Sequence, residues 1–457
     1  MKVRIDRAIA NVGVLKQMSA FSQVPVDDDE RLLVEPAQGP RNPVALAILS
    51  IIVGIFAGLI GSIFRLCLHK TDVLRTTIIT RAHLWGWRGI LLIIVIPAAA
   101  AGIAAWLVRK FSPESSGSGI PHVEKQLKQG WSGNPVRIIL VKFFGGILAI
   151  GSGLALGREG PSVQTGASIG QLVGRVFHRN ANEQRVLLAA GAGAGLATAF
   201  NAPIAGAVFV LEELVGRFDG PVTIATLGAS AGAIAVARVL LGVAPDFQID
   251  SLKYPGFGTI PADLALGAMF GLLGVLYSRV LLKCLDVSAS MGKIPATWRA
   301  SMIGALIGLL GWFAPQVIGG GDVLTEQALR GDVLLRDLVL LLAIRFVLGP
   351  LSYAARTPGG LFAPMLTIGA QGGLLFGTIW SRLFVSNATL PREFAVVGMA
   401  TFFASVVRAP VTGIILAIEL TGCFTLLLPM LGAVFAAMTV ATILKEPPIY
   451  DSLRDRS

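Results

Sequence analysis

Charged residues are scarce in this sequence: Asp, Glu, Lys and Arg together make up 14% of its 457 residues. Soluble domains carry about 25% charged residues, and a soluble chain of this length would fold into roughly two or three domains with polar surfaces. Hydrophobic residues instead reach 54%, and the mean hydropathy is +0.73. The composition therefore excludes an ordinary soluble protein and indicates a chain that crosses a membrane several times.

Cysteine and histidine are also rare. The three cysteines form no CxxC pair, and the four histidines lie far apart in the sequence. These residues are Cys67, Cys284, Cys423, His69, His83, His122 and His178. They supply neither a disulfide framework nor a zinc site, so we expect no metal and no cofactor. No histidine lies deep in an apolar run, where an intramembrane enzyme would need a base, so we expect that the protein is not an enzyme.

The net charge of +11 lacks the pattern that nucleic-acid binding requires, because no basic patch is interleaved with aromatic residues. We interpret Lys and Arg as anchors at the membrane interface that bind lipid headgroups. Residues 1–43 are polar, with an acidic run at 27–30, and lack the apolar core of a signal peptide. We expect them to form a short arm before a membrane domain at 44–457, with no soluble C-terminal domain.

What the sequence does contain is long apolar runs. Five of them approach or exceed the ~20 residues that span a bilayer. They cover residues 44–68, 88–108, 222–242, 261–283 and 424–444. Other apolar stretches are shorter and are interrupted by some of the 54 glycines and 24 prolines. We predict an all-α polytopic membrane protein in which full spans alternate with tilted or half-spanning helices.

Two blocks of the sequence recur in order. Residues 141–170 share eight identities with residues 203 positions later, and residues 191–213 share six identities with residues 207 positions later. The second block aligns Glu212 with a glutamate of the second half. Repeats of this kind commonly face each other about a pseudo-two-fold axis, with the site near mid-membrane between them. We predict two repeats, at about 44–242 and 261–450. Lys and Arg occur in linkers throughout, so the residues leave the relative orientation of the repeats open; an inverted pair is expected by analogy with other repeats of this kind.

Glycine or proline precedes or opens a helix in four interrupted segments. Their sequences are GSGIP (117–121), GREGP (157–161), PGGLFAP (358–364) and PPIYDSL (447–453). Because backbone cannot be left unpaired in lipid, such segments are expected to line a cavity or pack on protein. A helix N-terminus offers free N–H groups and the positive end of the helix dipole, which favour an anion. Several converging ends would bind a transported anion without the tight grip of a lysine, so we predict an anion site at the repeat interface.

Glu159 is the most informative single residue, because it lies between Gly157 and Pro161 inside an apolar block. An acid within a membrane segment is by default a functional-site hypothesis. Its carboxylate could occupy the anion site and release the site on protonation. The alternative is a local ion pair with Arg158. The repeat counterpart of Glu159 is Phe362, so only one half offers this carboxylate.

Four other polar side chains have two interpretations each. Ser118 and Tyr450 could each donate a hydrogen bond to an anion, but a serine here also fits a helix cap and a tyrosine an interfacial anchor. Glu212 and Glu213 end the apolar run IAGAVFVLEEL, where they fit either a solvated helix end or a proton entry point.

The sequence resembles the CLC family of chloride channels and chloride/proton antiporters over about residues 44–455. GSGIP, GREGP and GGLFAP match its three anion-site motifs in order, and the tyrosine of PPIYDSL and the segment NAPIAGAVFVLEEL also match. The resemblance implies an external gate at Glu159, which accepts the proton, and internal proton transfer at Glu213, with Glu212 and Glu124 nearby. The implied anion-binding residues are Ser118, Gly119, Ile120, Arg158, Gly160, Leu361, Phe362 and Tyr450. His122 after the first motif and the extra proline of Pro447–Pro448 depart from the family pattern.

By the same resemblance, the protein is expected to transport chloride in exchange for protons. The alternatives are a passive chloride channel gated by voltage or pH and an exchanger for another anion such as nitrate. Family members are homodimers with one pore per subunit. The matching dimer surface lies near residues 204–216, 221–242, 411–421 and 424–444. The cytoplasmic CBS pair of eukaryotic members is absent, which indicates a prokaryotic protein of the plasma membrane (the inner membrane of a Gram-negative cell) with cytoplasmic termini.

Overall fold

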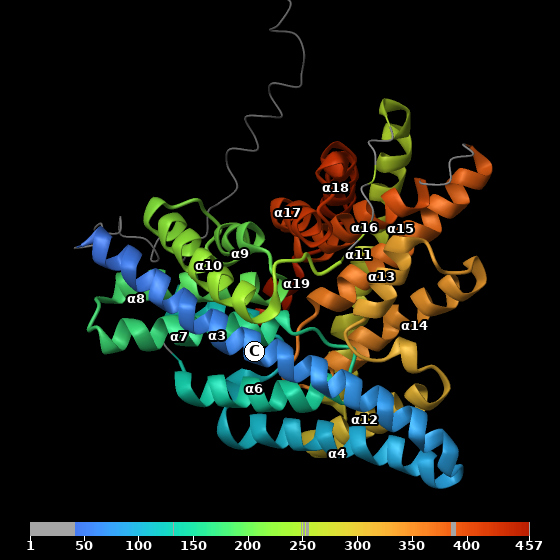
Figure 1. The fold of residues 1–457 in the computed structure, drawn as a ribbon, viewed down its shortest axis with the longest axis horizontal. Coiled ribbons are helices and arrows are strands. Elements are labelled where there is room, and N and C mark those ends of the chain that lie inside the picture. The colour runs from blue at the N-terminus through green and yellow to red at the C-terminus, as the bar shows by residue number, and fades with distance from the viewer. Residues whose placement is uncertain are drawn as a thin grey trace, which may run out of the picture. The chain divides into compact units, whose positions relative to one another are not determined.

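The computed structural model describes residues 42–130, 132–247, 249, 252, 256–384 and 390–456. Within these residues all regular secondary structure is helical, and the only extended pairing is two isolated β-bridges (Figure 1). The all-α prediction is confirmed. Residues 1–41 of the predicted polar arm lie outside the described residues.

The helices vary widely in length. In chain order they are α3 (Pro43–Ala82), α4 (Trp87–Phe111), α5 (Ile120–Gln129), α6 (Pro135–Gly151), α7 (Glu159–Val176), α8 (Ala181–Phe200), α9 (Pro203–Phe209), α10 (Gly220–Leu241), α11 (Ile260–Ser290), α12 (Ala296–Phe313), α13 (Asp322–Arg330), α14 (Leu335–Tyr353), α15 (Phe362–Leu383), α16 (Leu390–Val407), α17 (Pro410–Thr421), α18 (Leu427–Ile443) and α19 (Ile449–Arg454). A π-helical turn, Val210–Leu214, continues α9.

Seven helical segments of the described chain are long and apolar enough to cross a bilayer. Five of them contain or nearly coincide with the apolar runs that the sequence predicts, and the other two, Phe362–Leu383 and Leu390–Val407, were not predicted as spans. Of their most apolar windows, 78% and 89% of the residues are buried inside the protein. Because these helices contact protein and not lipid, small and polar side chains replace part of the apolar run that marks a lipid-facing span. The protein crosses the membrane several times.

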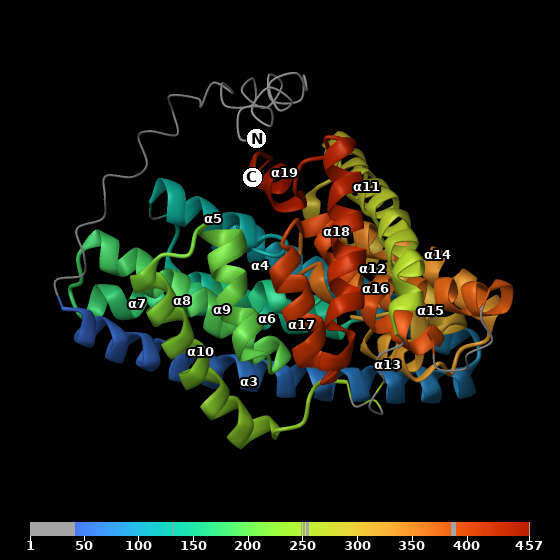
Figure 2. The same cartoon turned by 90° about the horizontal axis from the view of Figure 1, so that it is seen from above.

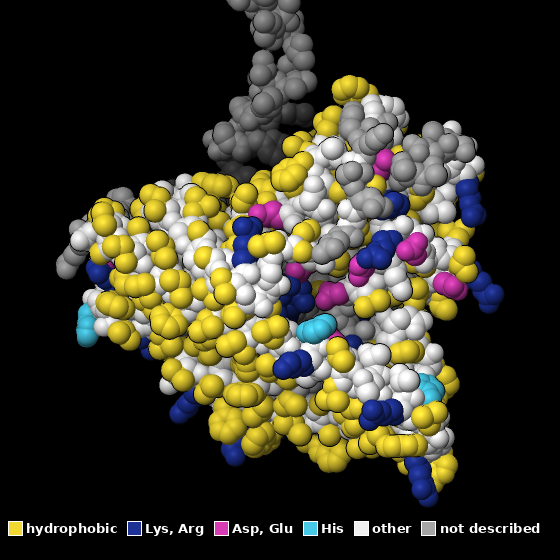
Figure 3. Space-filling model, viewed as in Figure 1, with side chains coloured by type: hydrophobic (Ala, Val, Ile, Leu, Met, Phe, Trp, Pro, Cys, Tyr) yellow, Lys and Arg dark blue, Asp and Glu magenta, His cyan; other side chains and the backbone are white. Residues whose placement is uncertain are grey.

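Exposed side chains on the outer helices show which surface faces lipid. Large hydrophobic side chains that are exposed include Phe56 on α3, Val95 on α4, Leu272 on α11 and Phe435 on α18. On the face that Figure 3 shows, hydrophobic side chains cover much of the surface, and acidic side chains lie mainly near its centre and right side. So large an apolar surface suits hydrocarbon and not water.

Each half of the chain contains an equivalent close crossing of two helices. α7 packs on α8, and α15 packs on α16. A Cβ on Gly166 of α7 would lie 2.0 Å from the carbonyl oxygen of Gly191 in α8. A Cβ on Gly369 of α15 would lie 2.5 Å from the carbonyl oxygen of Gly398 in α16. These positions correspond in the repeat, so both halves use glycine to let two helix backbones touch. The predicted repeat boundaries themselves stay a prediction.

Figures 1 and 2 show how the halves meet. α9 and α17 lie side by side, and α10 and α18 each contact one of them. The short helix α19 lies beside α5. Helices of both halves thus contact one another through α9 and α17.

We predict that Gly166→Ala and Gly369→Ala each destabilise the protein by roughly 1–3 kcal/mol, because the added methyl group must push two backbones apart. Thermal unfolding in detergent measures the change. The matched control is Gly220→Ala at the exposed start of α10, where no atom lies within 4 Å of the new Cβ. Equal melting temperatures for all three variants would show that these crossings are not close.

Candidate anion site between broken helices

The broken segments pair with one another through their backbones. The Gly117 amide donates to the Thr357 carbonyl at 3.2 Å, and the Gly359 amide donates to the Gly117 carbonyl at 3.0 Å. Gly157 and Gly360 exchange two further bonds of 2.8 and 2.7 Å. The segment 357–360 therefore lies between the other two breaks. This confirms that the irregular segments pack on protein, where their polar groups are satisfied.

A helix begins at each of the four predicted breaks. α5 begins after Gly119, α7 begins at Glu159, α15 begins at Phe362 and α19 begins after Pro448. Gly119 has φ of +82°, which a side chain would strain, so glycine is needed at that turn. The free N–H groups of these first turns provide positive potential without a formal charge.

Glycine also lets the first turn of α7 reach Ser118. A Cβ on Gly160 would lie 2.8 Å from the Ser118 Cα, and a Cβ on Gly360 would lie 2.9 Å from the Gly160 amide nitrogen. The side chains of Ser118, Ile120, Leu361, Phe362 and Tyr450 are all fully buried. Ile120, Leu361, Phe362 and Tyr450 belong to one hydrophobic cluster, so the tertiary structure brings together residues that lie far apart in the sequence.

Ser118 acts as a cap and keeps its capacity to donate. Its hydroxyl oxygen accepts the Ile120 amide at 3.3 Å, in the first turn of α5, and its own amide donates to the Tyr353 hydroxyl at 3.3 Å. A serine hydroxyl can accept and donate at once. The cap and anion-donor interpretations are therefore compatible.

Tyr450 lies inside the protein, so the interfacial-anchor interpretation is wrong. Its ring stacks on Phe362 at a centroid distance of 6.3 Å. Its hydroxyl is buried without a hydrogen-bond partner among the described residues. The helix starts directly after Pro448, so the extra proline leaves the tyrosine in the core. A buried hydroxyl without a protein partner is a donor ready for a ligand.

The Glu159 carboxylate lies where an anion would bind. Its side chain is buried, and Oε2 has no hydrogen-bond partner among the described residues. The backbone N–H of Ala363, in the first turn of α15, lies close enough to interact with the carboxylate. Oε2 would lie 1.9 Å from a Cβ on Gly157 and 3.4 Å from a Cβ on Gly360. The carboxylate therefore points from α7 to the N-terminus of α15.

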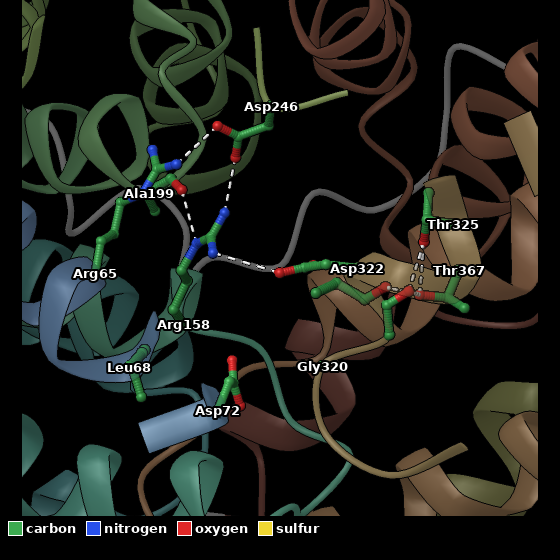
Figure 4. A network of polar contacts seen from close by, with 12 residues as sticks. Arg65, Leu68, Asp72, Arg158, Ala199, Asp246, Gly320, Asp322, Thr325 and Thr367 are labelled. Carbon is green, nitrogen blue, oxygen red and sulfur yellow. Dashed lines mark hydrogen bonds and ion pairs between the residues drawn. The ribbon is translucent and has the colours of Figure 1, made fainter. Parts of the chain in front are cut away.

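Arg158 does not form the local pair with Glu159. Its guanidinium bonds the Asp246 carboxylate at 2.7 Å, the Ala199 carbonyl at 2.9 Å and, more weakly, the Asp322 carboxylate at 3.4 Å (Figure 4). The guanidinium group of Arg158 is thus paired with Asp246 and Asp322 and not with Glu159. The carboxylate of Glu159 is left facing backbone dipoles.

Glu212 and Glu213 have different surroundings although they are neighbours. The Glu212 carboxylate accepts the amides of Val411 and Thr412 at 2.9 and 2.7 Å and the Thr412 hydroxyl at 2.7 Å. Glu212 therefore caps α17 and is not a solvated helix end. Glu213 is half-buried on the π-helical turn, and such turns often mark functional sites. Its charged neighbours include Glu124 and Asp451.

A second glutamate has the same capping role as Glu212. Glu419, its repeat counterpart, accepts the amides of Ile204 and Ala205 at 3.1 and 2.7 Å and so caps α9. Each half of the chain thus caps a helix of the other half. Glu213 has Leu420 as its counterpart in the repeat alignment, as Glu159 has Phe362. The carboxylate that both halves share is structural, whereas Glu159 and Glu213 occur only in the first half.

Two buried cations, not predicted from the sequence, bond irregular backbone before α5 and before α13. Lys142 on α6 is fully buried and donates to the Gly117 carbonyl at 2.7 Å. Arg345 on α14 is fully buried and donates to the carbonyls of Val317, Gly319 and Gly320. The two cations lie 203 positions apart, the offset of the repeat. A basic residue at the same place in two apolar helices was the available signal.

A cavity of about 720 Å³ leads toward Ser118. Gly117, Gly119 and Tyr353 line its inner end, together with His122. The imidazole of His122 hydrogen-bonds Gln164 on α7 and Ser132 on the loop before α6, both at 3.0 Å. His122 thus joins structural contacts beside the cavity. Among the described residues no cluster of three or more acidic, His or Cys side chains could hold a metal ion.

Together, the fold and the site define a multi-pass membrane protein whose broken helices direct their N-termini at a buried site, an arrangement typical of membrane transporters and channels. The family model described as voltage gated chloride channel matches residues 100–442. The chain belongs to this family, as the resemblance of its motifs predicts.

Individual relatives match nearly the whole chain. It is 36% identical over 452 residues to the H(+)/Cl(-) exchange transporter ClcA of Vibrio cholerae serotype O1 (strain M66-2), covering 96% of this chain and 95% of the relative. It is 37% identical over 427 residues to ClcA of Vibrio parahaemolyticus, covering 91% and 90%. The crystal structure of a slow cyanobacterial Cl-/H+ antiporter superposes with a TM-score of 0.86 and 32% identity, covering 90% of this chain and 97% of that chain. A eukaryotic CLC transporter shares the fold, with a TM-score of 0.75 and 24% identity, covering 90% and 74%.

We predict that Glu212→Gln and Glu419→Gln each lower stability by about 1 kcal/mol, as loss of a good helix cap does, because the amide group offers one acceptor oxygen where the carboxylate offers two. Melting temperature in detergent measures this effect. Both variants should keep proton-coupled transport per folded molecule. Loss of proton transport in Glu212→Gln alone would contradict the structural role.

Proposed function

We propose that this protein exchanges chloride for protons across the membrane, with Glu159 as the gate. The observation that supports the proposal most directly is the position of the Glu159 carboxylate at the N-terminus of α15. A carboxylate there takes the place of the transported anion. The names of the relatives, which are chloride/proton exchangers, agree with this function.

Neutral donors recognise chloride in this proposal. The hydroxyls of Ser118 and Tyr450 and the backbone N–H groups of Leu361 and Phe362 surround the central site, with Gly119 and Ile120 behind Ser118. The outer site lies at the first turn of α7, at the backbone of Arg158 and Gly160. Dipoles and hydroxyl groups bind a dehydrated anion yet let it leave, which a buried ammonium group would not. No cofactor takes part.

Protonation drives the exchange. When Glu159 accepts a proton, its carboxyl group loses its attraction to the helix N-termini, and chloride can replace it. When it releases the proton, the carboxylate returns and displaces chloride. Chloride and the proton therefore use the same position alternately, which couples their opposite movements.

Glu213 delivers protons on the other side. It lies on the π-helical turn near charged groups of α5 and α19, and Tyr450 is within electrostatic reach of both Glu213 and Glu159. The proton route thus ends at Glu213, a residue of the first half. Chloride follows a separate route through Ser118. The protein works as a transporter and not as an enzyme.

The proposal extends to assembly and location. α9, α10, α17 and α18 contact one another in the chain α10–α9–α17–α18 and expose apolar side chains such as Ile204, Ile224, Val411 and Phe435. We propose that two copies meet on this surface, with one pore in each. The other exposed apolar surfaces contact lipid. The proposed location is a prokaryotic plasma membrane, the inner membrane in a Gram-negative cell, with both termini cytoplasmic.

The experiment that tests the function uses purified protein in liposomes, with chloride and proton fluxes recorded together. At zero membrane potential, an imposed chloride gradient should drive protons uphill. Chloride movement without uphill proton movement would replace the exchanger with a passive channel.

Glu159→Gln should carry chloride without protons, because an amide mimics the neutral acid and cannot titrate. We expect proton flux to fall on the order of 100-fold or more, the size that loss of a positioned proton-transfer group produces. Parallel flux recordings in liposomes measure both ions. Continued chloride-driven proton pumping in this variant would rule out the gate assignment.

Glu213→Gln should also lose proton movement while chloride still flows, because the anion route does not include this residue. The expected loss of proton flux is again on the order of 100-fold. Glu212→Gln is the matched control, since it makes the same change one position away at a structural cap. Equal proton fluxes in the two variants would mean that Glu213 has no special role.

A further inference from the structure

The chain between the two repeats lies against the outer site. We call its described residues 242–247, 249 and 252 the inter-repeat linker. The linker connects α10 to the segment before α11, and one of its residues, Asp246, faces the break that contains Glu159 (Figure 4). No role for the linker follows from the anion-site motifs.

Asp246 joins two arginines of the first half. Its Oδ1 lies 2.7 Å from Arg65 on α3, and its Oδ2 lies 2.7 Å from Arg158. Both guanidinium groups also donate to carbonyls at the end of α8, Arg65 to Thr198 at 3.0 Å and Arg158 to Ala199 at 2.9 Å. The side chains of Asp246, Arg65 and Arg158 are only 10%, 15% and 19% exposed. An ion pair with so little solvent is screened weakly by salt.

The linker is also tied to the second half. The Phe247 amide donates to the Leu420 carbonyl, the last turn of α17, at 3.1 Å. The Thr425 hydroxyl donates to the Leu252 carbonyl at 2.7 Å. The side chain of Phe247 is buried. The carboxylate of Asp246 is therefore held in place from both repeats.

The charges around Arg158 come from several elements. Arg65 and Asp72 lie on α3, Asp246 on the linker and Asp322 at the start of α13. Asp72 is paired with Arg75 at 2.6 Å, and Asp322 is 55% exposed. The weakly solvated set is thus two guanidinium groups and one carboxylate, with a net charge of +1. The residue after Arg158 is Glu159.

We propose that Asp246 is a positioning residue that fixes Arg158 and limits the positive potential at the Glu159 gate. The inference rests on the proposed function of Glu159 as a proton-controlled gate. With Asp246 ionised, one arginine charge is neutralised, and the site stays neutral enough for the carboxylate to be protonated and leave. Without it, only the exposed carboxylate of Asp322 would offset the two arginine charges, and both the Glu159 carboxylate and chloride would be held more tightly.

The test compares the pH dependence of chloride flux in liposomes for four proteins. In Asp246→Asn the set of Arg65, Arg158 and residue 246 carries a net charge of +2. The added positive charge favours the Glu159 carboxylate, so the pH of half-maximal flux should fall. In Arg65→Gln the set is neutral, so half-maximal flux should move to higher pH. A shift of roughly half a pH unit or more is the size that one unit charge produces across about 10 Å of partly screened medium.

The double variant Arg65→Gln/Asp246→Asn distinguishes an electrostatic role of Asp246 from a purely structural one. Its set again carries +1, so its pH profile should return to that of the unmutated protein although it lacks more contacts than either single variant. A scaffold role predicts the opposite, with the double variant most impaired and no ordered shift. Unshifted profiles in both single variants, or no return in the double variant, would overturn the proposal.

The same measurements distinguish a failure of the role of Asp246 from a failure of the proposed function. If the unmutated protein shows no proton-coupled chloride flux, the exchanger proposal fails first. If it exchanges normally and the variants do not order by charge, only the role of Asp246 fails. Should Asp246→Asn not fold, the predicted shift of Arg65→Gln to higher pH still decides, because this variant changes the same charge balance from the opposite side.

Discussion

The need to pair every backbone polar group in a low-dielectric interior underlies this structure. An anion site built from helix N-termini requires interrupted helices, and each interruption exposes amides and carbonyls that lipid cannot satisfy. Here the interruptions satisfy one another: Gly157 pairs with Gly360, and Gly117 pairs with Thr357 and Gly359. Lys142 donates a further bond to the Gly117 carbonyl, and Arg345 donates to carbonyls of the segment before α13. The site can exist at membrane depth because both halves of the chain contribute to this pairing.

The repeat explains which residues hold the fold and which perform chemistry. Features that both halves share are structural, such as the glycine crossings, the two buried cations and the caps made by Glu212 and Glu419. Features found in one half alone include Glu159 and Glu213. Glu159 corresponds to Phe362, so one helix N-terminus receives a titratable carboxylate and the other an aromatic side chain that packs on Tyr450. Two symmetric halves thereby enclose a site that is not symmetric.

Positively charged side chains lie beside the buried site and do not face it. Uncharged N–H and hydroxyl groups face the buried site, and guanidinium groups lie beside it, where carboxylates balance them. Arg158 shows the arrangement most clearly, since it lies within the GREGP break yet directs its charge toward Asp246 and Asp322. A buried cation that faced the anion directly would bind it too strongly for rapid release.

The sequence alone determined the class of protein, five of the seven described spans, the internal repeat and the positions where helices start. These features depend on composition, on run length and on Gly and Pro at a break, which act over a few neighbouring residues. It also singled out Glu159, because an acid in an apolar block is unusual whatever surrounds it.

Only the tertiary structure decided what each polar residue contacts. Glu212 and Glu213 are neighbours with the same side chain, and only contacts with α17, about 200 positions away, make Glu212 a cap. Tyr450 is a core residue because α19 packs against α5 and α16. The interior spans α15 and α16 escaped prediction because their surroundings are protein and not lipid, so they carry no lipid-facing pattern. Long-range packing sets these environments, and no local pattern encodes them.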